Sequence, residues 1–124
     1  MKTIPKYQPS YIKIVPWEEI EKRYVDLISC GWKMESMLNL VKHIKGNNLD
    51  KRLFAYTSLD KLIVTIYNPG ETGREELRIQ FDQHTKRWHF EYYPKPFEPT
   101  EMERFYPEEE GINKFCEFIE WLKW

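Results

Sequence analysis

The sequence lacks the short motifs that identify a chemical function. It contains no Cys-x-x-Cys and no His-Glu-x-x-His spacing, so it predicts neither a zinc site nor any other metal site. No Gly-x-Ser-x-Gly element presents a nucleophilic serine. The one glycine-rich stretch, from Asn68 to Arg74, opens no helix, although a phosphate site needs a helix N-terminus at that place. Motifs therefore assign no catalytic residue, no cofactor and no family.

Long apolar runs and a cysteine framework are absent as well. No run of about 18 apolar residues exists, which excludes a membrane-spanning helix, and residues 1–6 lack the apolar core of a signal peptide. The two cysteines, Cys30 and Cys116, lie in apolar helical patterns, which predicts buried free thiols in a reducing compartment. These observations predict a cytoplasmic protein without a membrane partner.

A strong charge of either sign is also missing. The chain has 19 Lys and Arg residues and 20 Asp and Glu residues, which give a net charge of −1. As a whole it therefore offers no electrostatic attraction to nucleic acid or membranes. A length of 124 residues, with 41% hydrophobic and 31% charged residues, is typical of one soluble globular domain. Aromatic residues make up 16%, and a small core filled with large side chains explains this high content.

A regular β pattern is present between residues 52 and 93. Apolar and polar side chains alternate from Glu75 to Asp82, and the same alternation returns from Arg87 to Tyr93. Since successive side chains of a strand point to opposite faces, each run predicts a strand with one buried and one wet face. Leu62 to Tyr67 is almost wholly apolar and predicts a central strand, and Leu53 to Thr57 predicts a shorter one.

Three further segments show the spacing of amphipathic helices. The first begins at Pro16 and stops at Gly31, and the second runs from about Lys33 to Lys45, with two methionines expected in its core stripe. The third opens at Pro107, and Gly111 in its first turns is expected to weaken it by about 1 kcal/mol relative to alanine.

These segments predict a single α+β domain over residues 1–124. Its antiparallel β-meander of three to five strands is covered mainly on one face by two N-terminal helices and one C-terminal helix, in the order α-α-β-β-β-β-α. Residues 1–15 predict an extended arm or an edge strand. Residues 94–107 contain four prolines, which predicts a long loop unable to pair as a strand.

Two surfaces are candidates for binding a partner. The first is an acidic segment with aromatic residues, because charge steers an encounter and aromatic side chains supply buried contact area. Its members are Phe97, Glu101, Glu103, Phe105, Tyr106, Glu108, Glu109 and Glu110. The second is the wet face of the sheet, whose members are Tyr67, Arg78, Gln80, His89 and Tyr93.

The leading hypothesis is a non-catalytic cytoplasmic interaction domain that binds a basic partner protein through the acidic segment or the sheet face. Small inhibitors and immunity-type proteins share this size and charge, which is an analogy and not a motif. The alternative is a domain that binds single-stranded nucleic acid on the sheet face, and an enzyme of unidentified class comes third. A homodimer stays open, either through the sheet face or through Trp124; only one of Trp121 and Trp124 is expected to be exposed.

Overall fold

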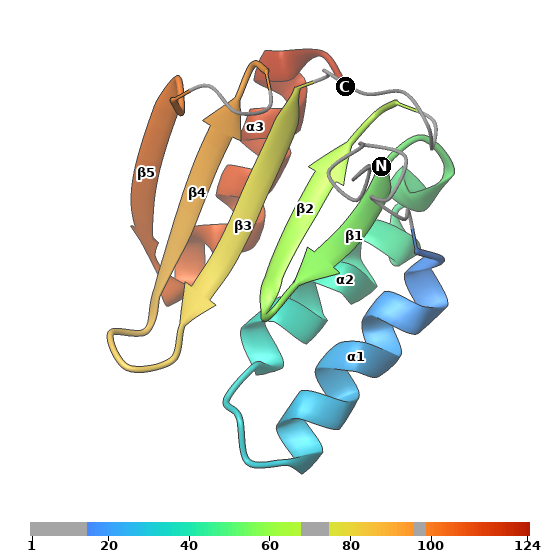
Figure 1. The fold of residues 1–124 in the computed structure, drawn as a ribbon, viewed down its shortest axis with the longest axis vertical. Coiled ribbons are helices and arrows are strands. Elements are labelled where there is room, and N and C mark those ends of the chain that lie inside the picture. The colour runs from blue at the N-terminus through green and yellow to red at the C-terminus, as the bar shows by residue number, and fades with distance from the viewer. Residues whose placement is uncertain (1–14, 68–74, 96–98) are drawn as a thin grey trace, which may run out of the picture.

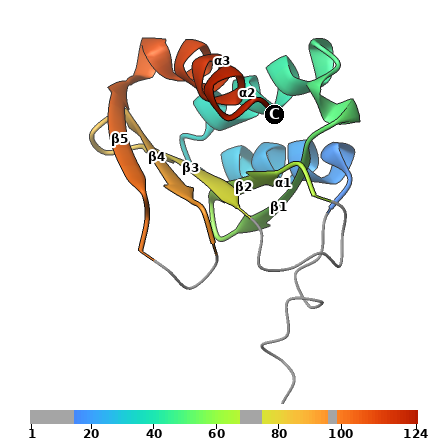
Figure 2. The same cartoon turned by 90° about the horizontal axis from the view of Figure 1, so that it is seen from above.

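The computed structural model describes residues 15–67, 75–95 and 99–124. It has two layers, a single antiparallel sheet of five strands and three α-helices on one side of it (Figures 1 and 2). This confirms the predicted α+β class and the helix cover on one face. Residues 1–14 of the expected N-terminal arm and the glycine-rich turn from Asn68 to Arg74 lie outside the described residues, as does Phe97.

The strands follow one another across the sheet in chain order, so each one pairs antiparallel with its neighbours in the sequence. A meander of this kind needs only short connections between neighbours. The strands are β1 (Phe54–Ser58), β2 (Lys61–Thr65), β3 (Glu76–Asp82), β4 (Arg87–Tyr93) and β5 (Met102–Pro107).

The alternation read from the sequence sets the two faces of the sheet. In the β3–β4 pair, Ile79 lies opposite Phe90 and Phe81 opposite Trp88, and all four side chains are buried. Their neighbours along each strand, including Arg78, point to the outer face. The strand predicted to be central, β2, is an inner strand between β1 and β3. Its outer side is covered as predicted, because Ile63 there is only 3% exposed.

The expectation of a loop over residues 94–107 is wrong for its second half. Residues 102–107 form β5, which pairs with β4 from Met102 opposite Tyr92 to Pro107 opposite Arg87. Proline removes a ladder hydrogen bond only at its own position, and Pro107 is the last residue of a strand at the edge of the sheet. The other prolines precede the strand, so they do not prevent pairing.

Helix α1 (Trp17–Ser29) is held against the first strands by two side-chain donors. The indole Nε1 of Trp17 donates to the carbonyl oxygen of Leu53 at 3.0 Å, and the Tyr24 hydroxyl donates to that of Asp60 at 2.9 Å. Both side chains are buried, so each polar tip needs a partner of this kind. Gly31 follows the helix with φ at 101°, the conformation predicted for its end.

Helix α2 (Glu35–Gly46) packs beside α1 and is followed by a short 3₁₀ turn, η3 (Leu49–Lys51). Met34 and Met37 are completely enclosed in the core, as their helical spacing predicted. Between the two helices, Lys45 Nζ lies 2.7 Å from Glu21 Oε1, and this hydrogen bond raises the pKa of Lys45.

Helix α3 (Gly111–Leu122) follows a 3₁₀ turn, η4 (Glu108–Glu110), and starts on the indole of Trp88. Trp88 Nε1 donates to the Glu108 carbonyl oxygen at 2.9 Å. A Cβ atom at Gly111 would lie 2.0 Å from Cε2 of the same indole. The sequence presented Gly111 as a weak point of the helix, whereas the structure shows that glycine is what allows the helix to approach the sheet.

The two cysteines are less buried than expected. Cys30 is exposed, contrary to the expected buried thiol, because it follows the last residue of α1, where the apolar stripe has already ended. Cys116 is half-buried, and both thiols are free.

Trp121 is 58% exposed and Trp124 only 8%, so one of the two tryptophans is exposed as predicted, and it is Trp121. None of the described helices is long and apolar enough to cross a membrane.

We predict that Gly111→Ala lowers the free energy of unfolding by about 1–2 kcal/mol. Alanine favours a helix by about 1 kcal/mol over glycine, but the new methyl group would overlap the rigid indole of Trp88, and overpacking of this kind typically costs about 1–3 kcal/mol even after adjustment. Urea unfolding followed by circular dichroism measures the change.

Gly46→Ala is the matched control. Gly46 is the last residue of α2, and a Cβ atom there would meet nothing within 4 Å. This variant should keep or slightly raise the free energy of unfolding. A Gly111→Ala protein as stable as the Gly46→Ala protein would contradict the close contact of α3 with Trp88.

Candidate functional site

β5 divides the predicted acidic segment between two sides of the molecule. Glu103 and Phe105 pair opposite Glu91 and His89 and therefore belong to the outer face of the sheet. Tyr106 lies opposite the buried Trp88 and points to the helix side, where its ring packs against Phe90. The two candidate surfaces thus meet on β4 and β5, and Glu103 and Phe105 join the predicted sheet-face residues His89 and Tyr93.

The remaining predicted residues are dispersed. Glu108, Glu109 and Glu110 are exposed in η4 at the far end of β5, and Glu108 Oε2 accepts a hydrogen bond from Ser36 Oγ of α2 at 2.9 Å. Glu101 is exposed just before β5. Tyr67 lies just beyond the end of β2, and its hydroxyl donates to Glu75 Oε1 at 2.9 Å.

The side chains of His89 and Phe105 stack on each other on the outer face of the sheet. Their rings are stacked with centroids 4.5 Å apart and planes 2° from parallel. The guanidinium carbon of Arg87 lies 5.1 Å from the centroid of the Phe105 ring, a cation–π contact. Phe105 nevertheless stays 50% exposed, so a large aromatic surface remains open to a partner.

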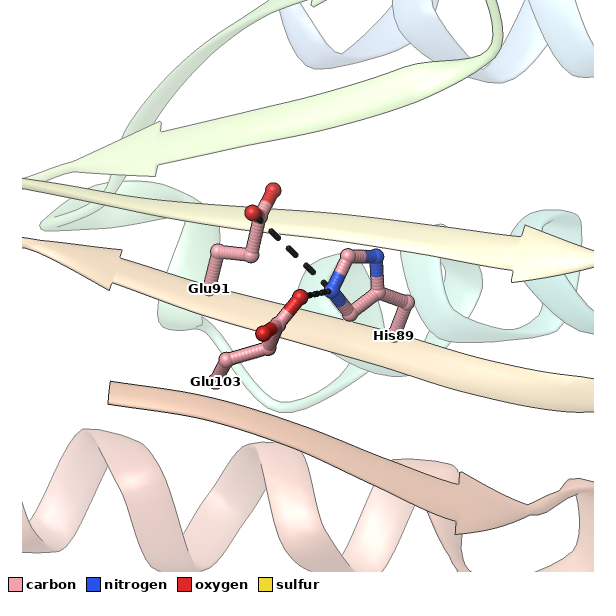
Figure 3. A group of neighbouring side chains, drawn as sticks. All are labelled: His89, Glu91 and Glu103. Atoms are coloured by element: carbon pink, nitrogen blue, oxygen red, sulfur yellow. Dashed lines mark hydrogen bonds and ion pairs between the residues drawn. The ribbon is translucent and has the colours of Figure 1, made fainter. Parts of the chain in front are cut away.

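Two carboxylates converge on the imidazole of His89 (Figure 3). Its Nε2 lies 2.6 Å from Glu103 Oε2 and 3.9 Å from Glu91 Oε2. The Tyr93 hydroxyl donates to the same Glu91 oxygen at 3.2 Å. One ligand atom from each of His89, Glu91 and Glu103 lies within 4.8 Å of the other two.

A paired network occupies the rest of the face. The Tyr56 hydroxyl donates to Glu76 Oε2 at 2.8 Å. A guanidinium nitrogen of Arg78 lies 3.3 Å from Glu76 Oε1. The guanidinium carbon of Arg78 lies 4.5 Å from the centroid of the Tyr93 ring. Burial raises the pKa of Tyr56, and the negative charge of Glu76 adds to the shift. Burial and then Glu91 raise the pKa of Tyr93. Both phenols therefore remain hydrogen-bond donors at neutral pH.

A hollow opens at the end of the sheet where β3 turns into β4. The cross-strand neighbours Gln80 and His89 line it from the sheet together with Phe105, and Trp32 borders it from the loop between α1 and α2. Gln80 Nε2 donates to Asp60 Oδ1 at 3.2 Å inside this hollow. The group of His89, Glu91 and Glu103, called the His89 cluster below, therefore borders a concave surface through His89.

A second depression runs along the helix side of β5. It is lined by side chains of β5 and α3 and contains the exposed ring of Trp121. Lys114 of α3 extends over the Tyr106 ring, with Nζ 5.3 Å from its centroid. The full lining is Met102, Arg104, Tyr106, Lys114, Glu117, Phe118 and Trp121. β5 therefore has a polar aromatic surface on one side and a groove on the other.

One arrangement resembles a nucleophilic site and is chemically unsuited to be one. His43 Nε2 lies 3.3 Å from Cys116 Sγ, and its Nδ1 lies 3.3 Å from Asn47 Nδ2. Asn47 Nδ2 also donates to the His43 carbonyl oxygen at 2.8 Å. An amide nitrogen only donates, so this contact favours the tautomer in which Nδ1 accepts and the ring proton is on Nε2, facing the sulfur. Such a ring cannot remove the thiol proton.

The electrostatics of Cys116 lead to the same conclusion. Burial raises the pKa of the Cys116 thiol, and the nearby carboxylates of Glu120 and Glu117 raise it further. A reactive cysteine needs the opposite shift, because the thiolate is the nucleophile. The trio of His43, Asn47 and Cys116 therefore joins α2 to α3 and is not a candidate catalytic centre.

Comparison with known proteins gives no family assignment. No protein-family model matches the chain, and no curated protein and no solved structure matches it either.

The His89 cluster was missed in the sequence for a definable reason. His89 and Glu91 are two residues apart on a predicted strand, so their common face was readable. Glu103 belongs to the segment expected to be a loop, and only the pairing of β5 with β4 brings it opposite Glu91. A spacing motif could not reveal a site whose third member comes from a different strand.

We predict that Cys116 reacts with a thiol reagent at pH 7 on the order of ten times more slowly than Cys30. Cys30 is exposed, whereas Cys116 is half-buried and its pKa is raised. The rates are measured with Ellman's reagent on the Cys30→Ser and Cys116→Ser variants, each of which keeps one thiol. A faster reaction of Cys116 would show that His43 activates it and would make His43 and Cys116 a candidate catalytic pair.

Proposed function

We propose that the protein is a non-catalytic cytoplasmic interaction domain that binds a basic segment of a partner protein along β5. The observation that carries this proposal is the position of β5, which pairs with β4 and with no other strand among the described residues. An edge strand offers unpaired backbone N–H and C=O groups, and an extended peptide of another protein binds by pairing with them.

The side chains around β5 support binding of an extended segment. The alternate side chains of an added strand point to opposite faces. On one face they would contact the exposed ring of Phe105, and on the other they would enter the groove that contains Trp121. Backbone pairing supplies affinity in such complexes, and surfaces for alternate side chains supply specificity.

The charges around this edge support a basic partner. The exposed acidic residues along the edge and the adjoining helix are Glu101, Glu103, Glu108, Glu109, Glu110, Glu117 and Glu120. The same charges disfavour pairing between two copies of this edge, because like charges would then face each other. A partner that carries Lys or Arg on its strand meets no such repulsion and associates faster.

Binding of single-stranded nucleic acid on the sheet face is supported less well. The guanidinium of Arg78 is already in contact with Glu76 and the Tyr93 ring, and the imidazole of His89 is in contact with Glu103 and Phe105. A phosphate backbone approaching this face would meet carboxylates beside each basic group, which weakens the electrostatic attraction on which such binding depends.

We predict that Phe105→Ala weakens binding of the basic partner by about tenfold or more, because exposed aromatic residues at the centre of an interface often contribute over 1 kcal/mol. The partner is first captured from the native host by cross-linking to the wild-type chain, and its affinity is then measured by calorimetry. Val25→Ala, an exposed apolar residue on α1, is the matched control and should leave the affinity unchanged.

The charge part of the proposal has its own test in the same assay. The double charge reversal Glu109→Lys with Glu110→Lys should weaken binding, and the loss should shrink as salt is added. Glu19→Lys with Asp26→Lys makes the same change of net charge on the exposed side of α1 and should have little effect. Equal losses from both pairs would show that only the total charge matters and that β5 is not the binding edge.

A further inference from the structure

The outer face of β4 and β5 carries a feature that binding of a peptide along the edge does not explain. Glu91 and Glu103 lie directly opposite each other in the antiparallel pairing and on the same face. Like charges directly opposite each other destabilise a sheet. A bound cation between them would remove this repulsion. The imidazole of His89 lies on the same side, next to both carboxylates (Figure 3).

The three side chains form a donor set for a metal ion. Imidazole nitrogen together with carboxylate oxygen suits zinc and its neighbours among the divalent transition metals, whereas magnesium and calcium prefer oxygen ligands alone. The two carboxylates also match the charge of a divalent cation. Three protein ligands with one position left for water is the usual composition of an open zinc site.

Two of the three ligand separations are within about 1 Å of those that zinc requires, and the third, between the two carboxylates, lies within 4.8 Å. Zinc bond lengths of roughly 2.0–2.2 Å and tetrahedral angles place two ligand atoms about 3.4 Å apart. The observed separations from His89 Nε2 are 2.6 Å to Glu103 Oε2 and 3.9 Å to Glu91 Oε2. One contact must open and the other must close, each by less than about 1 Å. Rotation of the Glu103 side chain, which is exposed, provides the first change.

Neighbouring side chains hold the ligands in place. Stacking on Phe105 fixes the plane of the His89 ring, with only 2° between the two rings. The Tyr93 hydroxyl donates to Glu91 Oε2 at 3.2 Å, and a hydrogen bond of this kind orients a ligating carboxylate. Two of the ligands are on β4, whose backbone is held by pairing with β3 on one side and β5 on the other.

From this geometry we propose that His89, Glu91 and Glu103 form a binding site for a divalent transition-metal ion of the zinc class. The ion joins β4 to β5 on the outer face of the sheet. Its remaining coordination position faces solvent and takes water or a ligand. The site adds metal binding to the interaction surface and does not depend on the partner proposed for β5.

The test is titration of the metal-free full-length chain with zinc, followed by calorimetry. Wild type is expected to bind one equivalent, with a rise in Tm because a ligand that binds the folded state stabilises it. His89→Ala and Glu103→Gln are each expected to weaken binding by about tenfold or more and to remove the rise in Tm. Magnesium at the same concentration should have no effect on Tm.

Two controls separate this site from other zinc ligands of the chain. His84 is exposed in the turn between β3 and β4, and Cys30 is exposed after α1. His84→Ala and Cys30→Ser should bind zinc like wild type. Absence of binding by the wild-type chain would overturn the proposal. It would also fall if the affinity survived in both His89→Ala and Glu103→Gln, or if it were lost in His84→Ala or Cys30→Ser instead.

Discussion

The contact between Trp88 and Gly111 determines how the two layers of this protein meet. The indole of Trp88 is almost fully buried, and its one polar atom bonds to the carbonyl oxygen of Glu108 just before α3 begins. Glycine at the first position of α3 lets the helix backbone lie directly on the ring. Because β5 leads without a loop into η4 and α3, this contact also fixes the end of β5 against β4. The exposed edge therefore has a rigid support.

The outer face follows from this one-sided arrangement. All three α-helices cover the other side. Among the described residues, the polar side chains on the outer face of β3, β4 and β5 bond to one another, to Tyr56 of β1 and to Asp60 in the turn after it. They form a continuous set of contacts, from Tyr56 through Glu76 and Arg78 to Tyr93 and Glu91. At the β5 side the set ends in the His89 cluster, where two carboxylates share one imidazole. The excess of carboxylate there makes the cluster suitable for a cation.

The surroundings of His43 differ from those of His89. His43 and Cys116 lie between two helices, where burial and neighbouring carboxylates keep the thiol protonated. His89 lies on an open strand face beside a hollow, where its ring is accessible and oriented. His89 faces two carboxylates on this open strand face, whereas His43 faces a thiol between two helices.

The sequence by itself determined the helices, the first four strands and the one-sided cover, because periods of two and 3.6 residues report burial directly. It could not identify β5, since prolines around Met102 to Pro107 and its exposed side chains hide the strand pattern. It also placed Cys30 in the core and treated Gly111 as a defect, because neither the end of a helix stripe nor the approach of Trp88 is a local property. Only the tertiary structure placed Glu103 beside His89 and Glu91, since strand pairing joins residues that no sequence spacing relates.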